Sequence, residues 1–423
     1  MTLSLRPEEL ELARILRPGD RIVLGQACGE PTTLVRALIE QGANIAGLSA
    51  FIATSFSGLF TPETATSFAL SSMGAIGALR AMTKAGKLAV IPCHVSQIGP
   101  LISARIIGCD VAMIQVSPAD ASGNHSCGLI GDYVRAAVDT ARVVIAEVNE
   151  QVPWVPGETI PTVAIDVAVQ VSQSPVEVAA VAISPTDEAI ARHAAHYIGD
   201  GAVIQTGIGA VPDAILRLLH DRKDVGVHSG MLGDGLVDLA EAGVLTNARK
   251  EIDRGVSING ALIGTRRLYD WADRNPAIRM CATSYTHDAA VLARLSRLVS
   301  INSAIEVDLT GQVNAEQSGA AYMGGTGGSV DFVRAGARAS GGRSLIALGS
   351  SARGGSLSKI VANLAGPVTS ARSEVDVIVT EYGAAELKGQ TLAERTRRMV
   401  AIAHPDFREE LDRAAFAIRA RGF

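Results

Sequence analysis

Two glycine-rich turns are the parts of this sequence best suited to chemistry on a large ligand. Residues 205–212 read Gln-Thr-Gly-Ile-Gly-Ala-Val-Pro between an apolar run and a helical stretch, and residues 324–328 read Gly-Gly-Thr-Gly-Gly. Because glycine has no Cβ atom, such turns expose backbone N–H groups that can hold a phosphate, a carbonyl oxygen or an oxyanion. The first turn lacks the third glycine of the dinucleotide fingerprint, and the second lacks the Gly-Lys-Ser/Thr of a P-loop. The two turns therefore argue against a dinucleotide site and a P-loop nucleotide site, and they favour another kind of ligand.

Histidine and serine are adjacent at His228-Ser229 and at His125-Ser126. These are residue types of a Ser–His–Asp hydrolase, but no Gly-x-Ser-x-Gly elbow surrounds either serine. The sequence therefore argues against a serine nucleophile. Five cysteines, in no metal-ligand spacing and odd in number, are expected to be free, buried, apolar residues of a reducing compartment. They are Cys28, Cys93, Cys109, Cys127 and Cys281.

The elements that must position these turns alternate in type along the chain. Apolar, β-branched runs predict buried strands at 22–24, 88–91, 111–116, 143–146, 202–205, 345–348 and 375–379. Alanine-rich stretches predict helices at 33–40, 135–141 and 212–219. Continuous apolar strands between helices indicate a mostly parallel sheet covered on both faces, so the fold class is α/β.

Three sequence features recur in the same order in both halves of the chain. The strand–glycine turn–helix pattern of residues 19–31 recurs at 199–212, residues 115–124 are echoed by 306–314, and 144–149 resemble 378–383. A repeat of this length predicts two related α/β domains. Serine, proline and glutamine cluster at 171–188, so we place the domains at 1–180 and 181–423. Active sites of such proteins lie between domains, beyond the carboxyl ends of strands.

Composition narrows the classes of partner. The chain has 423 residues, a net charge of −5 and no dense run of Lys or Arg, which argues against nucleic acid as a partner. Its N-terminus begins mixed and acidic, unlike a signal peptide, and no run of about 18 apolar residues predicts a membrane span. We expect a cytoplasmic protein without a metal site.

Many stretches of the chain resemble the acetyl-CoA hydrolase/transferase family, which includes 4-hydroxybutyrate and acetate CoA-transferases. The matching pieces are residues 110–126, 146–149, 234–239, 243–247, 264–269, 275–276, 300–313, 327–332, 380–383 and 402–408. The resemblance implies two similar CoA-transferase-like (NagB/RpiA-like) α/β domains with mostly parallel sheets. It also implies an acyl-CoA and a carboxylic acid as substrates, no separate cofactor, and a homodimer or homotetramer. Gly207, Ile208, Gly209, Ala210 and Val211 would contact CoA, and Gly327 and Gly328 would bind CoA or hold the oxyanion.

One position departs from the family pattern. Family transferases attack the thioester with a glutamate that follows His-Ser, whereas this chain reads His228-Ser229-Gly230-Met231. Glu63 and Glu30 of the first half are the preferred surrogate nucleophiles. Asp234 and Glu316 also carry carboxylates, but they belong to the ordinary family pattern and are expected to have a turn role and a positional role.

The glycine at position 230 leaves other outcomes open. It could leave room for water, which would make the chain a thioester hydrolase, or the chain could bind acyl-CoA without catalysis. From the sequence alone, restoring glutamate at position 230 is expected to raise acyl transfer.

Overall fold

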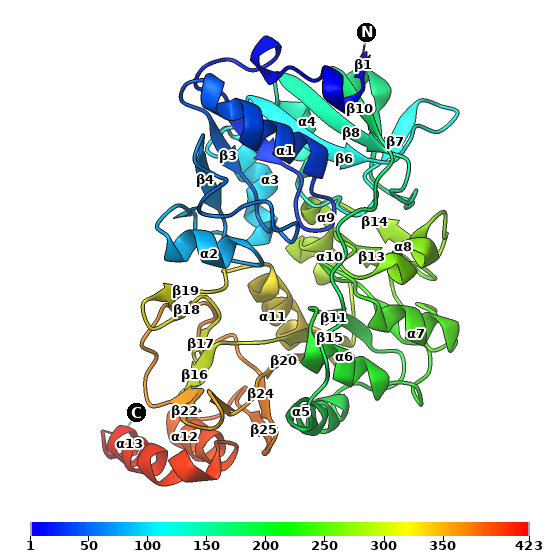
Figure 1. Ribbon diagram of the computed structural model, residues 1–423. Helices are drawn as coiled ribbons and strands as arrows, with labels where there is room; N and C mark the ends of the chain where they lie inside the picture. Colours follow the sequence, from blue (N-terminus) through cyan, green and yellow to red (C-terminus); the bar gives the residue numbers. More distant parts are fainter. Residues whose placement is uncertain (1, 422–423) are drawn as a thin grey trace.

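A parallel sheet of eight strands forms the centre of the first half (Figure 1). This computed structural model describes residues 2–421. The strand order is β1-β10-β8-β6-β2-β3-β4-β5, and every neighbouring pair is parallel. The strands are β1 Leu3–Leu5, β2 Arg21–Leu24, β3 Ser49–Phe51, β4 Ala69–Ser72, β5 Ala89–Val90, β6 Val111–Val116, β8 Val143–Asn149 and β10 Val167–Val171.

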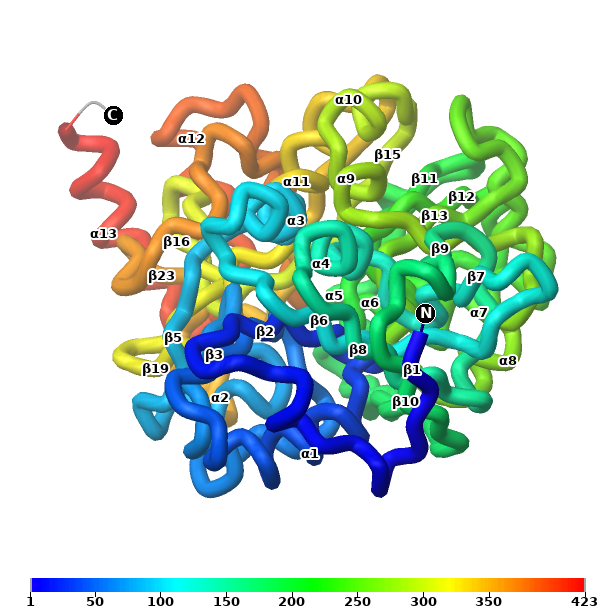
Figure 2. Tube along the Cα trace, turned by 90° about the horizontal axis from the view of Figure 1, so that it is seen from above, coloured from blue at the N-terminus to red at the C-terminus, as the bar shows by residue number. Residues whose placement is uncertain are grey.

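Alternation of apolar side chains explains why helices cover both faces of this sheet. Ile22 and Leu24 belong to the buried cluster that includes residues of α1, whereas Val23 belongs to the cluster that includes residues of α3 and α4. Successive side chains of a strand point to opposite faces, so an apolar run needs cover on both. The helices of this half are α1 Thr32–Gln41, α2 Leu79–Lys84, α3 Val95–Ser103 and α4 Val134–Thr140, and Figure 2 shows α3 and α4 side by side.

The second half repeats this plan with six strands in the order β12-β11-β15-β20-β24-β25, of which only β24 and β25 pair antiparallel. The strands are β11 Val203–Thr206, β12 Gly226–Val227, β15 Leu298–Asn302, β20 Arg343–Ala347, β24 Val377–Thr380 and β25 Gly383–Glu386. Its helices are α5 Pro185–Ala195, α6 Ala210–Arg217, α7 Gly235–Glu241, α8 Arg266–Ala272, α9 Thr283–Thr286, α10 Ala289–Leu292, α11 Ser329–Arg338, α12 Leu392–Ala401 and α13 Arg408–Ala420.

Short strand pairs complete the fold: β7 Asn124–Ser126 with β9 Thr159–Pro161, β13 Ser257–Asn259 with β14 Ile278–Met280, β18 Gln317–Ser318 with β19 Ala321–Tyr322, and β21 Ser351–Ala352 with β22 Leu357–Ser358. A three-stranded sheet joins β16 Glu306–Asp308 to β17 Val313–Asn314 and β23 Ile360–Val361.

The two halves share one apolar core. The largest buried cluster contains residues of both, including Ile130 and Leu262, and the N–H of Leu262 donates to the carbonyl of Leu129 at 2.8 Å. Along the chain, β10 is the last strand of the eight-stranded sheet, and the helix α5 of the second half begins at Pro185. Residues 172–184 connect the halves without regular secondary structure.

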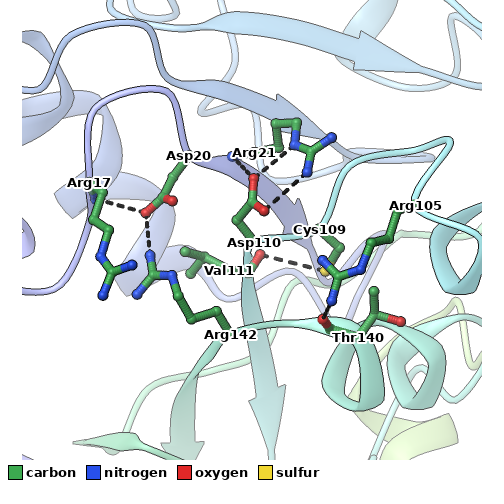
Figure 3. A network of polar contacts seen from close by, with 9 residues as sticks. All are labelled: Arg17, Asp20, Arg21, Arg105, Cys109, Asp110, Val111, Thr140 and Arg142. Atoms are coloured by element: carbon green, nitrogen blue, oxygen red, sulfur yellow. Dashed lines mark hydrogen bonds and ion pairs between the residues drawn. The ribbon is translucent and has the colours of Figure 1, made fainter.

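Ion pairs hold the amino ends of the central strands in the first half (Figure 3). Asp20 lies just before β2 and accepts from the guanidinium of Arg142 and the N–H of Arg17, both at 2.7 Å. Asp110 lies just before β6 and pairs with Arg21 at 2.8 Å, which lowers the pKa of its carboxyl through the hydrogen bond from that guanidinium. This network is at the edge of the sheet opposite to the carboxyl ends, so it is structural.

The predicted α/β class with mostly parallel sheets is confirmed, and each predicted strand and helix overlaps an observed one. The first of the three internal echoes lies at equivalent places, because β2 and β11 both precede a glycine turn. The second does not, since 115–124 begins in β6 of the eight-stranded sheet but 306–314 spans β16 and β17 of the separate three-stranded sheet. The third echo does not, since β8 is two places from β2 but β24 is three places from β11. All five cysteines are free and buried, as expected. No helix in residues 2–421 is both long and apolar enough to span a membrane.

Candidate functional site

The glycine turn after β11 opens into unoccupied space. Gly209 has φ +119°, a backbone conformation that favours glycine, and it precedes the first turn of α6. A Cβ atom on Gly207 or on Gly209 would meet no other atom within 4 Å. Ile208 and Val211 are half-buried. The turn thus offers bare backbone at the carboxyl end of a central strand, where α/β proteins bind their ligands.

The loop after β12 lies directly beside this turn. The hydroxyl of Ser229 donates to the carbonyl of Thr206 at 3.1 Å, so it links the ends of the two strands rather than acting as a nucleophile. Asp234 accepts the N–H and the hydroxyl of Thr265 at 3.0 and 2.8 Å. Asp234 therefore joins the start of α7 to the residue before α8, a structural contact between two loops.

The glycine-rich loop 324–328 is hydrogen-bonded to the first half. Its carbonyls accept from two first-half N–H groups, Ala75 to Gly324 at 2.7 Å and Val95 to Gly327 at 3.0 Å. Glu316 fixes the preceding segment, because it accepts the hydroxyl of Tyr322 at 2.6 Å and that of Thr369 at 2.8 Å. Its position supports the positional role expected from the sequence.

His287 occupies the space between Gly230 and Gly328. A Cβ atom on Gly230 would lie 2.7 Å from Cε1 and 2.9 Å from Nε2 of this imidazole, and a Cβ atom on Gly328 would overlap Nε2. The ring also packs edge-on against Phe332, with ring centroids 4.8 Å apart. Both loops therefore need glycine where they touch the histidine, and the space that a side chain at position 230 would enter is filled by a ring instead of water.

The environment of His287 keeps its imidazole neutral. The residue is only 5% exposed, and burial lowers its pKa to about 3, with a smaller contribution from nearby His228. The Nδ1 atom lies 2.8 Å from the hydroxyl of Thr286. Nε2 has no hydrogen-bond partner in the described part of the chain, and this atom keeps some exposed surface.

The two candidate surrogate nucleophiles lie in different surroundings. Glu30 is fully buried and accepts the hydroxyls of Ser55 at 2.8 Å and Ser57 at 2.6 Å, and desolvation raises its pKa to about 7. Glu63 is exposed, and its pKa is lowered chiefly by a hydrogen bond from Thr61. Ser55 pairs with Gly77, and Gly74 of the same segment pairs with Gly325. Glu30 is therefore linked to the glycine-rich loop through a short chain of contacts.

His287 was not among the residues predicted from the sequence. In the sequence it stands in Tyr-Thr-His-Asp, a stretch with no catalytic spacing. Its relation to Gly230 and Gly328 depends on how α9 packs between two loops that are distant in sequence. The sequence signal for a ring between the two loops is glycine at both positions, because loops that pack closely against a ring leave no room for side chains. No group of three His, Cys, Asp or Glu side chains suited to a metal ion occurs among residues 2–421.

Comparison with known proteins places this arrangement in a family. Residues 6–182 match the model of the acetyl-CoA hydrolase/transferase N-terminal domain, and residues 264–415 match that of the C-terminal domain. The 4-hydroxybutyrate coenzyme A transferase of Clostridium kluyveri is 38% identical over 92% of either chain. A succinyl-CoA:cyclohexane-1-carboxylate CoA transferase of Geobacter metallireducens is 32% identical over 96% of this chain and 94% of its own. The crystal structure of RipA from Yersinia pestis superposes with a TM-score of 0.91 at 33% identity, covering 99% of this chain and 97% of that one.

Proposed function

Since the chain belongs to the acetyl-CoA hydrolase/transferase family, we propose that it is an acyl-CoA:carboxylate CoA-transferase, which moves CoA from a small acyl-CoA to a carboxylic acid such as acetate. The observation that carries the proposal is a relative named as a CoA-transferase that matches nearly the whole chain. The open turn at Gly207 and Gly209 and the loop 324–328 would supply backbone for the ligand, and the link between them through Ser229, Gly230 and His287 supports this.

The two loops would have different roles. Residues 207–211 would contact the CoA part, because glycine there leaves space for a ligand against the backbone. Gly327 and Gly328 would hold the carbonyl oxygen, whose negative charge grows as the thioester is attacked. Glu316 and Asp234 keep the surrounding turns in shape through their hydrogen bonds.

A panel assay tests the transferase assignment. The protein is incubated with several acyl-CoAs, with and without acetate, and both free CoA-SH and new thioesters are measured. Formation of acetyl-CoA that depends on acetate supports transfer. Release of CoA-SH at the same rate without acetate would show hydrolysis instead, and binding without either product would show an acyl-CoA binder.

Gly209→Val is expected to weaken CoA binding while the chain still folds. Valine disfavours φ +119°, and its side chain would project into the space proposed for the ligand. Calorimetric titration with CoA measures the loss, which we expect to be at least about tenfold in Kd, or about 1.4 kcal/mol. Gly243→Val is the control, because Gly243 also has positive φ and open space but lies after α7. An unchanged Kd for Gly209→Val would remove this turn from the site.

A trapping experiment tests the surrogate nucleophile. A glutamate that attacks the thioester forms an acyl-glutamyl anhydride and releases CoA thiolate. The thiolate then attacks the glutamyl carbonyl, which gives a glutamyl-CoA thioester and releases the acyl group as a carboxylate. After incubation with acyl-CoA, borohydride should reduce that thioester and mark the peptide that carries Glu30 or Glu63. Glu30→Gln and Glu63→Gln identify which residue is marked. Rapid transfer with no marked peptide would contradict both candidates.

The remaining assignments are also proposals. The chain would use CoA only as a substrate and need no separate cofactor. Its five free cysteines support a reducing location such as the cytoplasm. The homodimer or homotetramer is supported by the family resemblance, and light scattering of the purified protein measures it.

A further inference from the structure

We propose that His287 is an oxyanion donor of this site: its neutral imidazole donates a hydrogen bond from Nε2–H to the carbonyl oxygen of the bound thioester. This inference rests on the proposed function for the identity of the ligand. It assigns a role in the reaction to the side chain that follows α9 directly and lies between the loops carrying Gly230 and Gly328.

The tautomer of His287 decides which of its nitrogens carries the hydrogen. The Thr286 hydroxyl has one hydrogen and two acceptors within reach, Nδ1 of His287 at 2.8 Å and the carbonyl of Ala282 at 3.4 Å. The hydroxyl can also accept from an Nδ1–H while it donates to Ala282, so Thr286 is compatible with both tautomers of the ring. A thioester carbonyl can only accept, so its binding selects the tautomer in which the hydroxyl donates to Nδ1. A neutral imidazole carries its one hydrogen on the other nitrogen, which is Nε2.

Nε2 lies at the junction of the two loops. A Cβ atom on Gly230 would stand 2.9 Å from it, and a Cβ atom on Gly328 would overlap it. Nε2 has no hydrogen-bond partner among residues 2–421, and it keeps some exposed surface although the side chain is 95% enclosed. A ligand oxygen can therefore reach it, and a hydrogen bond in such an enclosed place is stronger than one in water.

The surroundings of His287 limit the chemistry that its ring can do. A base or a nucleophile must become cationic, and burial next to Phe332 and His228 opposes a cation. A hydrogen-bond donor stays neutral throughout. An enclosed imidazole of low basicity is therefore suited to polarising a carbonyl, and it would act together with the N–H groups of Gly327 and Gly328.

The reaction then needs no proton from the histidine. A carboxylate oxygen, of the acceptor or of the chain, bonds to the thioester carbon, and the π electrons of the carbonyl move to its oxygen, where Nε2–H stabilises them. Collapse of this tetrahedral adduct breaks the C–S bond and releases CoA thiolate, which leaves an anhydride. The thiolate attacks the anhydride carbonyl that came from the attacking carboxylate. The original acyl group then leaves as a carboxylate, so atoms and charge balance.

Infrared spectroscopy tests the hydrogen bond directly. The probe is the carba analogue of acetyl-CoA, in which CH₂ replaces the sulfur, with ¹³C in the carbonyl; it binds but cannot react. We expect its carbonyl band to shift to lower wavenumber when it binds the wild-type protein, and to lose most of that shift in His287→Ala. His220→Ala, at an exposed position, is the matched control and should keep the full shift. An equal shift in wild type and His287→Ala would overturn the proposal.

Turnover gives a second measurement. Loss of one oxyanion donor lowers kcat by about 10²–10³-fold, so His287→Ala should fall in that range with a smaller change in KM. If His287→Ala does not fold or bind the analogue, His287→Phe replaces it, because phenylalanine keeps a ring between the two loops but has no N–H to donate. A full infrared shift in His287→Phe would overturn the proposal. Failure of the wild-type protein to bind the analogue would overturn both this inference and the proposed function, whereas binding and transfer with an unchanged shift would overturn this inference alone.

Discussion

Gly230→Glu is expected to lower acyl transfer and to destabilise the protein, although the sequence alone predicts a gain. The first carbon of the new side chain would lie 2.7 Å from Cε1 and 2.9 Å from Nε2 of His287, so the imidazole must leave its place. Forcing a side chain into a packed site costs about 1–3 kcal/mol. Displacing the oxyanion donor should also lower kcat by about 10²–10³-fold. Chemical unfolding and the acetate-dependent transfer assay measure the two effects.

Two further variants separate overpacking from chemistry. Gly230→Ala adds the same Cβ atom without a carboxylate, so it should show much of the loss. Gly230→Glu/His287→Ala gives the carboxylate the space that the ring occupied, and we expect it to transfer acyl groups faster than His287→Ala alone. A rise in transfer in Gly230→Glu itself, with unchanged stability, would mean that the ring moves aside freely and that its contact with Gly230 has no importance.

The stability of the protein is expected to fall as the pH rises from about 5 to about 8, in part because of Glu30. Burial raises the pKa of this carboxyl from 4.5 to about 7, so between these values the folded chain keeps a proton that the unfolded chain has released. The contribution is fully present below the unfolded pKa and is lost as the pH rises through the folded one. A shift of this size corresponds to about 3 kcal/mol.

Glu30→Gln should remove this part of the pH dependence, because glutamine stays neutral and its amide can still accept from a serine hydroxyl. We expect it to match the wild type near pH 5 and to exceed its free energy of unfolding at pH 8. Urea unfolding at several pH values measures the difference, with exposed Glu150→Gln as the control. Parallel curves for wild type and Glu30→Gln would show that the carboxyl is ionised in the folded protein.

The elements and the glycine turns could be predicted from the sequence because their causes are local. Apolar runs identify buried strands, and glycines before a helix identify a turn that exposes backbone. Gly230 was likewise recognisable as a departure from a family pattern. The position of His287 could not be predicted, because it depends on α9 packing against loops that are about 40 and 60 residues away along the chain.

Burial also separates residues that look alike in sequence. Glu30 and Glu63 are both carboxylates in first-half turns, yet one is enclosed by Ser55 and Ser57 and the other is exposed. Nothing in the residues around them specifies this difference, since it is decided by how the turns fold over the end of the sheet.

The hydrogen bonds from Ala75 and Val95 to the loop 324–328 affect how this protein could be recombined with its relatives. The loop is encoded with the second half, but its shape is fixed by N–H groups of the first. A hybrid gene joined near residue 180 would therefore combine a loop with an anchoring surface from another parent. Hybrids should retain function best when the segments that contain Ala75 and Val95 are inherited together with the loop, even though more than 200 residues separate them in the gene product.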